Sequence, residues 1–301
     1  MMTRIFQSVL RTIPAVLVAA VFVAPLLWMI ATSAKPIDEV RSADLKLLPA
    51  DVSRTPEYIV SNYVEGAWKE LPGGHRVNVS EGAWSTDVID FPQQFRNTVV
   101  VASLSTLGLA LSSAIVAYGM LFVPWAGRKP MHALLFVAMA IPFPVIIIPT
   151  YLLFKYLGLI GTLAPLWVPA WFGGAFGIYL LMQFFRRIPS EYFDAGRIDG
   201  LSNWGLFRHI VIPLSKPALV VVSIFHLAFV WNDFLGPLIF LHHESQFTLA
   251  LGLQRLMQQH GGTAWNTLMA ACTISLLPLL LIFISLEPLL MSALRSAFRK
   301  Q

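Results

Sequence analysis

Six long apolar runs constrain this chain more than any other feature of its sequence. A helix that crosses a lipid bilayer needs about 20 mostly apolar residues, and runs of about that length lie at about 13–33, 95–123, 132–154, 163–185, 217–241 and 264–290. Only 12% of the 301 residues are charged, and the mean hydropathy is +0.69, which is unlike typical soluble domains. The sequence predicts an all-α polytopic membrane protein in which residues 1–301 form a single domain with six spanning helices.

The first run is expected to remain as a span. It continues to Trp28 and Met29, and no small-residue cleavage pattern precedes Lys35, unlike in a secretory signal peptide. The one cysteine, Cys272, lies in the last run and can form no disulfide within the chain. We interpret it as a small apolar side chain rather than a reactive thiol.

Basic residues indicate how the spans are oriented. With a cytoplasmic N-terminus, six spans place 12 of the 21 basic residues inside, namely Arg4, Arg11, Arg128, Lys129, Arg186, Arg187, Arg197, Arg208, Lys216, Arg295, Arg299 and Lys300. The short external loops carry only Lys155 and Arg255, which agrees with the excess of positive charge on cytoplasmic loops. We therefore expect both termini in the cytoplasm, and the net charge of +5 reflects topology rather than nucleic-acid binding.

A long polar segment, about residues 34–94, is expected on the outer side of the membrane. It contains ten of the 16 acidic residues of the chain. Two alternatives stay open for its Trp68 and Trp84, which are anchoring at the membrane interface and contact with another protein. The aromatic belts of membrane proteins favour the first.

No motif points to catalysis in this chain. The sequence has no G-x-x-x-x-G-K-[ST] phosphate loop, no H-E-x-x-H zinc motif and no G-x-S-x-G nucleophile motif. Its seven histidines include no i, i+4 pair that could hold a metal on one helix face. We expect no enzymatic activity, metal or cofactor in the chain itself, and we expect His226 to find its hydrogen-bond partner inside the helix bundle.

A charged segment, about residues 186–216, separates the fourth and fifth runs on the cytoplasmic side. Ser190 is placed to cap a helix, Glu191 suits the positive end of the helix dipole, and Gly200 suits the helix end. A helix over about 191–199 is therefore predicted, with Ala195 and Gly196 as adjacent small residues. Charged side chains flank this pair at Asp194, Arg197 and Asp199.

A second short helix is predicted to begin at Ser202 and to end near Pro213, with Trp204, Leu206 and Phe207 on it. Two interpretations of the helical pair remain open. The pair could dock onto another protein, since small residues allow a partner to approach the backbone. It could instead lie on lipid, which would suit Trp204 and Phe207 but would require neither the small pair nor a glycine stop.

The same segment resembles the EAA loop of bacterial ABC importer permeases, in which E-A-A is followed by three residues, G, nine residues and I-x-L-P. Here Asp194-Ala195-Gly196 precedes Gly200 and Ile210-Val211-Ile212-Pro213 at the same spacing. Asp194 stands where the family has glutamate, Gly196 where it has its second alanine, and Ile212 where it has leucine.

The resemblance extends over nearly the whole chain. Within the family, the chain is most similar to the maltose-type branch, whose members carry carbohydrates. The matching stretches are Pro25 to Met29 with Ser33-Ala34-Lys35, Asn97-Thr98, Ile148 to Tyr151 with Leu157-Gly158-Leu159 and Gly161-Thr162, Ile198-Asp199-Gly200, and Trp231 to Phe234 with Pro237-Leu238. The resemblance implies the fold of a type I ABC importer permease, with six spans and a cytoplasmic coupling helix.

The resemblance also implies an assembly in the bacterial cytoplasmic (inner) membrane. This subunit would pair with a second homologous permease, two ATPase subunits would bind ATP and Mg below, and an extracytoplasmic solute-binding protein would deliver a carbohydrate. The helix over 191–199 would sit on one ATPase subunit and move the spans when the ATPase pair closes. The coupling residues would be Glu191, Asp194, Ala195, Gly196, Arg197, Asp199, Gly200 and Pro213.

Candidate substrate contacts lie in the fifth run. Asp233 is an acidic residue within an apolar run, and such residues are functional candidates. The alternative is a structural hydrogen bond to a neighbouring helix or to Asn232 or Trp231. Trp231 could stack on a sugar ring, although packing is the favoured interpretation.

Other functions stay open beside carbohydrate import. A permease for a polyol or a glycerol phosphate would carry a similar loop. An ion-coupled secondary transporter usually needs membrane-embedded carboxylates or repeated halves, yet Asp233 is the only acid deep in a predicted span and no repeat is visible. An intramembrane enzyme is disfavoured by the lack of a catalytic constellation.

Overall fold

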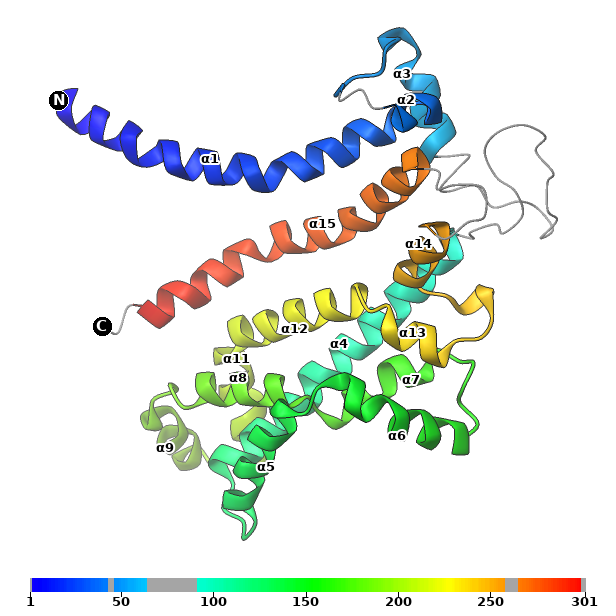
Figure 1. The fold of residues 1–301 in the computed structure, drawn as a ribbon. Coiled ribbons are helices and arrows are strands. Elements are labelled where there is room, and N and C mark those ends of the chain that lie inside the picture. Colours follow the sequence, from blue (N-terminus) through cyan, green and yellow to red (C-terminus); the bar gives the residue numbers. More distant parts are fainter. Residues whose placement is uncertain (1, 43–45, 64–90, 258–264, 299–301) are drawn as a thin grey trace. The chain divides into compact units, whose positions relative to one another are not determined.

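A computed structural model describes residues 2–42, 46–63, 91–257 and 265–298, and within these ranges the regular elements are all helices (Figure 1). The prediction of an all-α fold is confirmed. The chain divides into two compact units. The first unit comprises residues 1–92 and 252–278, and the second comprises residues 93–251 and 279–301. Trp68 and Trp84 lie outside the described residues.

Helices of membrane-spanning length account for most of the predicted apolar runs. Four described helices are long and apolar enough to cross a bilayer, namely Thr12–Ser33 within α1 (Met2–Ser33), α4 (Phe91–Phe122), Ala164–Phe185, and Trp265–Leu289 within α15 (Trp265–Phe298). Two bent helix pairs also qualify if each counts as one span, which brings the total in the described ranges to six at most.

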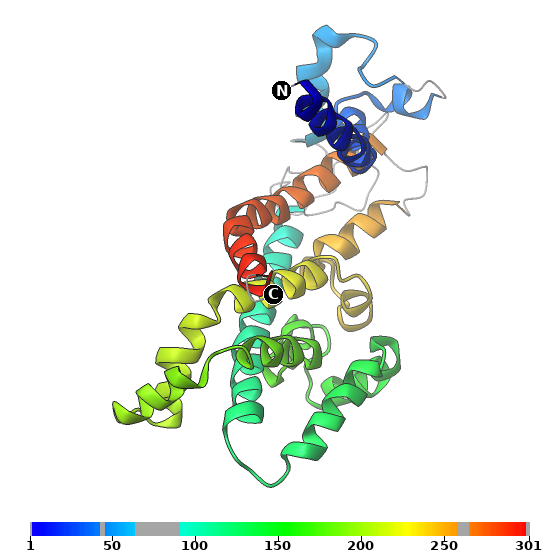
Figure 2. The same cartoon turned by 90° about the vertical axis from the view of Figure 1, so that its left-hand side faces the viewer.

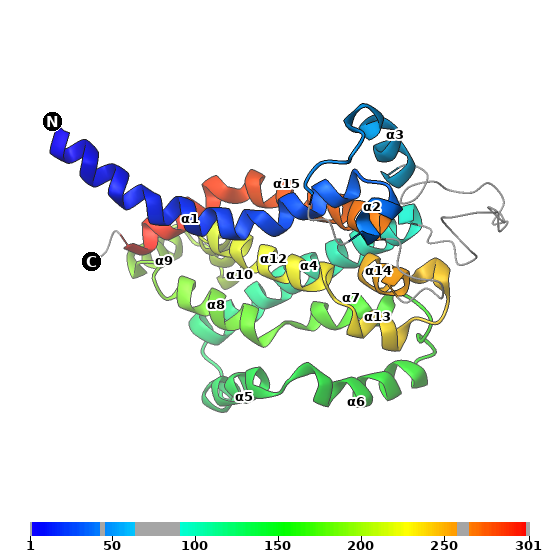
Figure 3. The same cartoon turned by 45° about the horizontal axis from the view of Figure 1, so that its top comes forward.

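The third apolar run is broken by prolines (Figure 3). Helix α5 (Arg128–Ala140) and helix α6 (Phe143–Tyr156) meet at an angle of 101°. Pro142 lies in the break as the N-cap residue of α6, and Pro144 lies in the first turn of α6. Proline lacks an N–H and restricts the preceding residue to extended conformations, which agrees with the ψ of 115° at Ile141. The third run is therefore kinked at this proline pair.

The fifth apolar run, at about 217–241, is divided between two helices. Helix α12 (Lys216–Trp231) is about 24 Å long at 1.5 Å per residue. Residues 232–234 separate it from the short helix α13 (Leu235–Phe240). The candidate substrate residues therefore lie at a break in the run and not inside a continuous helix.

The core of the second unit forms where α4, α8 (Ala175–Phe185) and α12 approach one another. Leu181 and Phe185 of α8 are fully buried, and Val222 of α12 is 2% exposed. Gly177 permits the close approach, because a Cβ there would lie 3.1 Å from Ser113 Oγ of α4 and 3.3 Å from Val222 Cγ1 of α12. Before α8, the chain passes through α7 (Ala164–Trp167) and the 3-10 helix η4 (Val168–Phe172).

At the other end of α4, two polar side chains hold the segment that follows α13. That segment contains the 3-10 helix η6 (Glu244–Gln246) and leads into α14 (Leu249–Met257). Asn97 Nδ2 donates to the carbonyls of Ser245 and Phe247, at 2.9 and 3.0 Å. Thr98 Oγ1 accepts from the amide of Leu249 at 2.8 Å, so α4 supplies the N-terminal cap of α14.

Short elements follow α1 in the first unit, namely α2 (Ile37–Arg41), the 3-10 helix η1 (Val52–Arg54) and α3 (Thr55–Ile59). The buried amide of Asn62 ties them together. Its Nδ2 donates to the carbonyls of Ser33 and Lys35, at 2.8 and 2.9 Å, and its Oδ1 accepts from Asn266 of α15 at 2.8 Å. Buried amide groups are nearly always hydrogen-bonded. The three bonds of Asn62 therefore hold the segment after α1 against the end of α1 and the start of α15.

Candidate functional site

The charged segment between α8 and α12 folds as a helical hairpin, residues 190–214 (Figures 1 and 2). Helix α9 (Ser190–Ile198) forms the first leg. The second leg is helical throughout, with α10 (Asn203–Leu206), a π-helical turn η5 (Phe207–Val211) and α11 (Ile212–Leu214). A bend of 74° at Ser215 separates this leg from α12.

The start of α9 differs from the prediction in one respect. Ser190 is not the cap, because Pro189 occupies the N-cap position with a ψ of 141° and Ser190 is already helical. The ring of Pro189 fixes its φ. Its carbonyl accepts the first hydrogen bond of the helix, from the amide of Tyr192 at 3.3 Å. Glu191 lies in the first turn, as predicted, and its side chain is exposed.

The end of α9 is the predicted glycine stop. Gly200 has a φ of +82°, a conformation that glycine adopts without steric cost. Its amide donates to the carbonyl of Arg197 at 3.0 Å, and the amide of Leu201 donates to the carbonyl of Gly196 at 2.9 Å. This is the Schellman pair of hydrogen bonds, so the prediction is confirmed.

The second leg begins at Ser202, also as predicted. Its Oγ accepts from the amide of Gly205 at 3.2 Å and caps α10. The two stop and start signals lie only two residues apart, so the connection between the legs is short and has a defined geometry.

The two small residues of α9 differ in their surroundings. Gly196 is buried against the second leg, where a Cβ would lie 2.6 Å from Leu206 Cδ2 and 2.7 Å from Ile210 Cδ1. Ala195 is exposed. The expectation that small residues open the backbone to a partner therefore stays a prediction for Ala195, whereas Gly196 serves the packing of the two legs.

The remaining predicted coupling residues line the outside of the hairpin. Asp194, Arg197, Asp199 and Pro213 are exposed, and Asp194 and Arg197 form an ion pair at 3.7 Å. Apolar side chains lie among them, since Ile198 is 87% and Tyr192 51% exposed. An exposed face that mixes a free aliphatic side chain with fixed charges is suited to binding another protein.

An aromatic cluster attaches both legs of the hairpin to the last turns of α4. In the first leg, the ring of Phe193 packs on that of Phe122 with 4.4 Å between ring centroids. In the second leg, the ring of Phe207 packs on that of Tyr118 with 5.1 Å between ring centroids. The hydroxyl of Tyr118 donates to the carbonyl of Asn203 at 2.9 Å.

Sequence reasoning missed this cluster. The available signal was the i, i+4 spacing of Tyr118 and Phe122, which places both rings on one side of α4. Apolar positions in a membrane helix gave no reason to single them out, because lipid contact alone would account for them.

The second group of candidates, Trp231, Asn232 and Asp233, lies at the other end of α12. Trp231 is buried, and its ring packs edge-on against Phe95 with 5.9 Å between centroids. Asn232 Nδ2 donates to the carbonyl of Ala228 at 2.8 Å, and its side chain is exposed.

Asp233 has a structural partner. Its Oδ1 accepts from the amide of Gly236 at 3.1 Å, at the start of α13. The alternative of a structural hydrogen bond therefore describes this residue, although the bond goes to the next helix of the same run. The structure does not bring this group together with the hairpin, because the length of α12 separates them.

His226 is paired inside the second unit, as predicted, with Nε2 2.8 Å from Ser105 Oγ of α4. Among the residues that the structure describes, no cluster of three or more His, Cys, Asp or Glu side chains could hold a metal.

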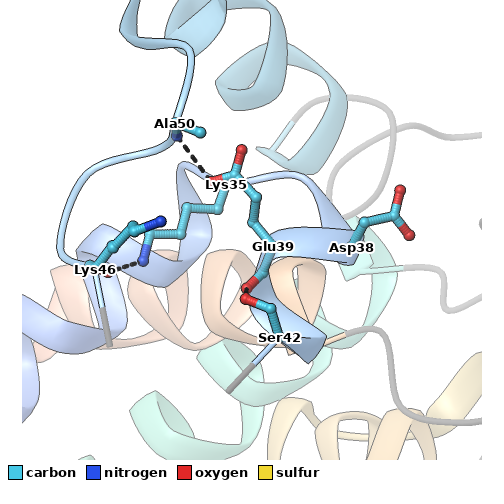
Figure 4. A pocket seen from close by; sticks show the side chains of 6 residues that line it. All are labelled: Lys35, Asp38, Glu39, Ser42, Lys46 and Ala50. Carbon is cyan, nitrogen blue, oxygen red and sulfur yellow. Dashed lines mark hydrogen bonds between the residues drawn. The ribbon is translucent and has the colours of Figure 1, made fainter. Parts of the chain in front are cut away.

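A polar hollow of about 240 Å³ lies in the first unit, lined by Lys35, Asp38, Glu39, Ser42, Lys46 and Ala50 (Figure 4). Two of its charged side chains form hydrogen bonds with the backbone of the same segment. The amino group of Lys35 donates to the carbonyl of Lys46, and Glu39 Oε2 accepts from the amide of Ala50 at 2.9 Å. These bonds hold the segment after α1 in place.

The chain is similar in sequence to known transport permeases and similar in fold to a chain of a solved transporter. AraQ, the arabinooligosaccharides transport system permease protein of Halalkalibacterium halodurans, is 28% identical over 92% of this chain and 91% of its own length. UgpE, the sn-glycerol-3-phosphate transport system permease protein of Brucella abortus, is 26% identical over 87% of each chain. In a solved bacterial ABC transporter that imports the acidic polysaccharide alginate, one chain has the same fold with a TM-score of 0.74 and 18% identity, covering 95% of this chain and 96% of its own.

A family model described as "Binding-protein-dependent transport system inner membrane component" matches residues 106–296. The matched region contains the hairpin, its aromatic attachment to α4 and the break between α12 and α13. Since the match covers more than half of the sequence, the chain belongs to the family of inner-membrane components of binding-protein-dependent transport systems.

Proposed function

We propose that this chain is a permease subunit of an ATP-driven ABC importer for a carbohydrate and forms half of its translocation pathway. It spans the bacterial cytoplasmic membrane with both termini in the cytoplasm. A second homologous permease supplies the other half, two ATPase subunits bind ATP and Mg, and an extracytoplasmic solute-binding protein delivers the substrate. The chain itself catalyses no reaction.

The observation that carries the proposal is the two-sided construction of the hairpin. One side is buried against α4 through Phe193 and Phe207, which are each 6% exposed. The other side exposes Ala195, Ile198 and the charges of Asp194 and Arg197. An element that receives force from an ATPase subunit needs an exposed surface to bind that subunit and a rigid attachment to pass the force on. A surface loop without a partner needs neither.

Transport then follows from movement of the hairpin as one body. When the ATPase pair closes on ATP, the α9 face moves with the subunit on which it rests. The Schellman turn at Gly200 and the packing of Gly196 keep the two legs together, so the motion passes to α8 and α12. Such a ligand-linked preference for one of two states is sufficient to switch the access of a central cavity.

A carbohydrate is the proposed substrate because the chain resembles an arabinooligosaccharide permease over 92% of its length. The substrate candidates in this chain have structural partners, Trp231 with Phe95 and Asp233 with Gly236. We therefore expect that the second permease and the binding protein determine most of the selectivity.

The test is purification of the tagged chain from its native membrane in mild detergent, followed by identification of stoichiometric partners. We expect an ATPase, a second permease and a solute-binding protein, and the last can be screened with sugars, polyols and sn-glycerol 3-phosphate. A binding protein that accepts only a polyol or glycerol phosphate would replace the substrate class. Repeated recovery of the folded chain alone would contradict the importer.

A matched pair of variants tests the hairpin in the same experiment. Ala195→Trp adds bulk to the exposed face of α9 and should abolish recovery of the ATPase. Ala126→Trp adds the same bulk at an exposed position between α4 and α5 and should leave recovery unchanged. Equal recovery with both variants would show that α9 is not the docking surface.

A further inference from the structure

Helix α4 is fastened at both ends to segments far from it in sequence. At one end, Tyr118 donates to the carbonyl of Asn203 in the hairpin at 2.9 Å, and its ring packs on Phe207. Tyr118 is only 6% exposed. We refer to this contact as the hairpin clamp.

The other end carries a second set of hydrogen bonds. Asn97 holds the carbonyls of Ser245 and Phe247, and Thr98 accepts from the amide of Leu249. Asn97 is 5% and Thr98 2% exposed. We refer to these three bonds as the loop clamp, since they hold the segment between α13 and α14.

The helix between the two clamps is continuous. Twenty residues separate Thr98 from Tyr118, or about 30 Å at 1.5 Å per residue, which equals the thickness of the hydrocarbon core. Past its first turn α4 contains no proline. Partly buried side-chain bonds support it along the way, between Ser105 and His226 at 2.8 Å and from Ser112 to the carbonyl of Ala170 at 3.1 Å.

We propose that Tyr118, Asn97 and Thr98 are positioning residues that make α4 a rod between the ATPase-docking hairpin and the outer segment before α14. This inference rests on the proposed function, and it adds a route for the motion. The hairpin is covalently joined only to α8 and α12. Without its contacts to α4, which are the hairpin clamp and the adjacent pair of Phe122 and Phe193, its movement would reach the outer segment through the break at residues 232–234. With both clamps in place, movement of the hairpin displaces α4 and the outer segment together.

The test places one fluorescent label just past the inner end of α4 and a second on the outer segment, in the complete importer. In a Cys272→Ser background, Ala126→Cys reports on the inner end of α4 and His243→Cys on the outer segment, and both positions are exposed. The probe is ATP with orthovanadate, which traps the closed ATPase pair. The amplitude of the fluorescence change is measured in parallel with the amount of ATPase bound.

The two clamps have different expected outcomes. Tyr118→Phe keeps the ring and removes the hydroxyl. It should reduce the amplitude of the fluorescence change at both labels about threefold or more, since one hydrogen bond contributes about 1 kcal/mol. Thr98→Val removes the acceptor for Leu249 and should reduce the response at position 243 while that at position 126 persists. If Tyr118 and Thr98 only stabilised the fold, each variant would lower the fluorescence change at both labels and would also lower the yield of the complex.

Tyr179→Phe serves as the matched control, because it makes the same change on α8, where the ring packs on Phe136. It should respond as the wild type does. Wild-type responses in Tyr118→Phe and Thr98→Val, or an equal loss in Tyr179→Phe, would overturn the rod. Failure of the unmodified complex to bind ATPase subunits would instead count against the proposed function.

Discussion

The hydroxyl of Tyr118 donates to the backbone carbonyl of Asn203 over 2.9 Å and joins two residues that are 85 positions apart. Without this bond the carbonyl near the start of the second leg would be held by local contacts only. With it, the hairpin is fastened to a third helix besides the two that it connects. The hairpin is therefore packed into the helix core of its unit.

The turn at Gly200 should be sensitive to any side chain. Gly200→Ala places a Cβ at a φ of +82° and should lower the free energy of unfolding by about 1 kcal/mol, whereas Gly200→Asn should be tolerated better. Gly119→Ala is the control, since a Cβ there meets no atom within 4 Å and should be neutral or stabilising by about 0.5 kcal/mol. Thermal unfolding in detergent compares them. Equal stability of all three variants would contradict the role of the turn.

The packing of Gly196 should couple the two legs of the hairpin. Gly196→Ala brings a methyl group within 2.7 Å of Ile210 Cδ1 and should destabilise the chain by about 1 kcal/mol. In an Ile210→Val background that Cδ1 is absent, so the same change should cost about 0.5 kcal/mol less. A double-mutant cycle of unfolding free energies measures the coupling. Strict additivity would show that the legs do not press on each other here.

Asp194 should matter for binding and not for stability. Its ion pair with Arg197 spans 3.7 Å and is exposed, and such pairs contribute about 0–1 kcal/mol. Asp194→Ala should therefore leave the unfolding temperature nearly unchanged and weaken ATPase binding about tenfold, the effect of losing one charge-assisted hydrogen bond. Asp194→Glu should restore binding, and Asp38→Ala should have no effect on it. Titration of the ATPase onto the permease in detergent gives the affinities.

Asp233 should tolerate loss of its charge but not of its acceptor. Asp233→Asn keeps an oxygen that can accept from the amide of Gly236, so uptake should persist. Asp233→Ala removes it and should cost about 1 kcal/mol, as with other lost helix caps. Uptake and unfolding temperature are measured for both variants. Loss of uptake in Asp233→Asn with normal stability would instead assign the charge to substrate or ion binding.

Much of the hairpin could be predicted because its signals are local. Gly200 terminates α9 and Ser202 begins α10 through bonds to residues at most four or five positions away. Ser190 failed as a cap for the same reason, since the adjacent Pro189 occupied that position. The proline break between α5 and α6 was likewise predictable, because proline acts on its own backbone and that of its neighbour.

The sequence by itself determined the all-helical membrane fold and the ends of α9, because apolar run length and cap chemistry act over a few residues. The tertiary structure alone decided which small residue of α9 faces outward and that Tyr118 holds the hairpin. These outcomes depend on distances between groups in different helices, as between the backbone of Gly196 and the side chain of Ile210 or between the hydroxyl of Tyr118 and the carbonyl of Asn203. Such distances arise only once the helices pack, which is why no pattern along the chain contained them.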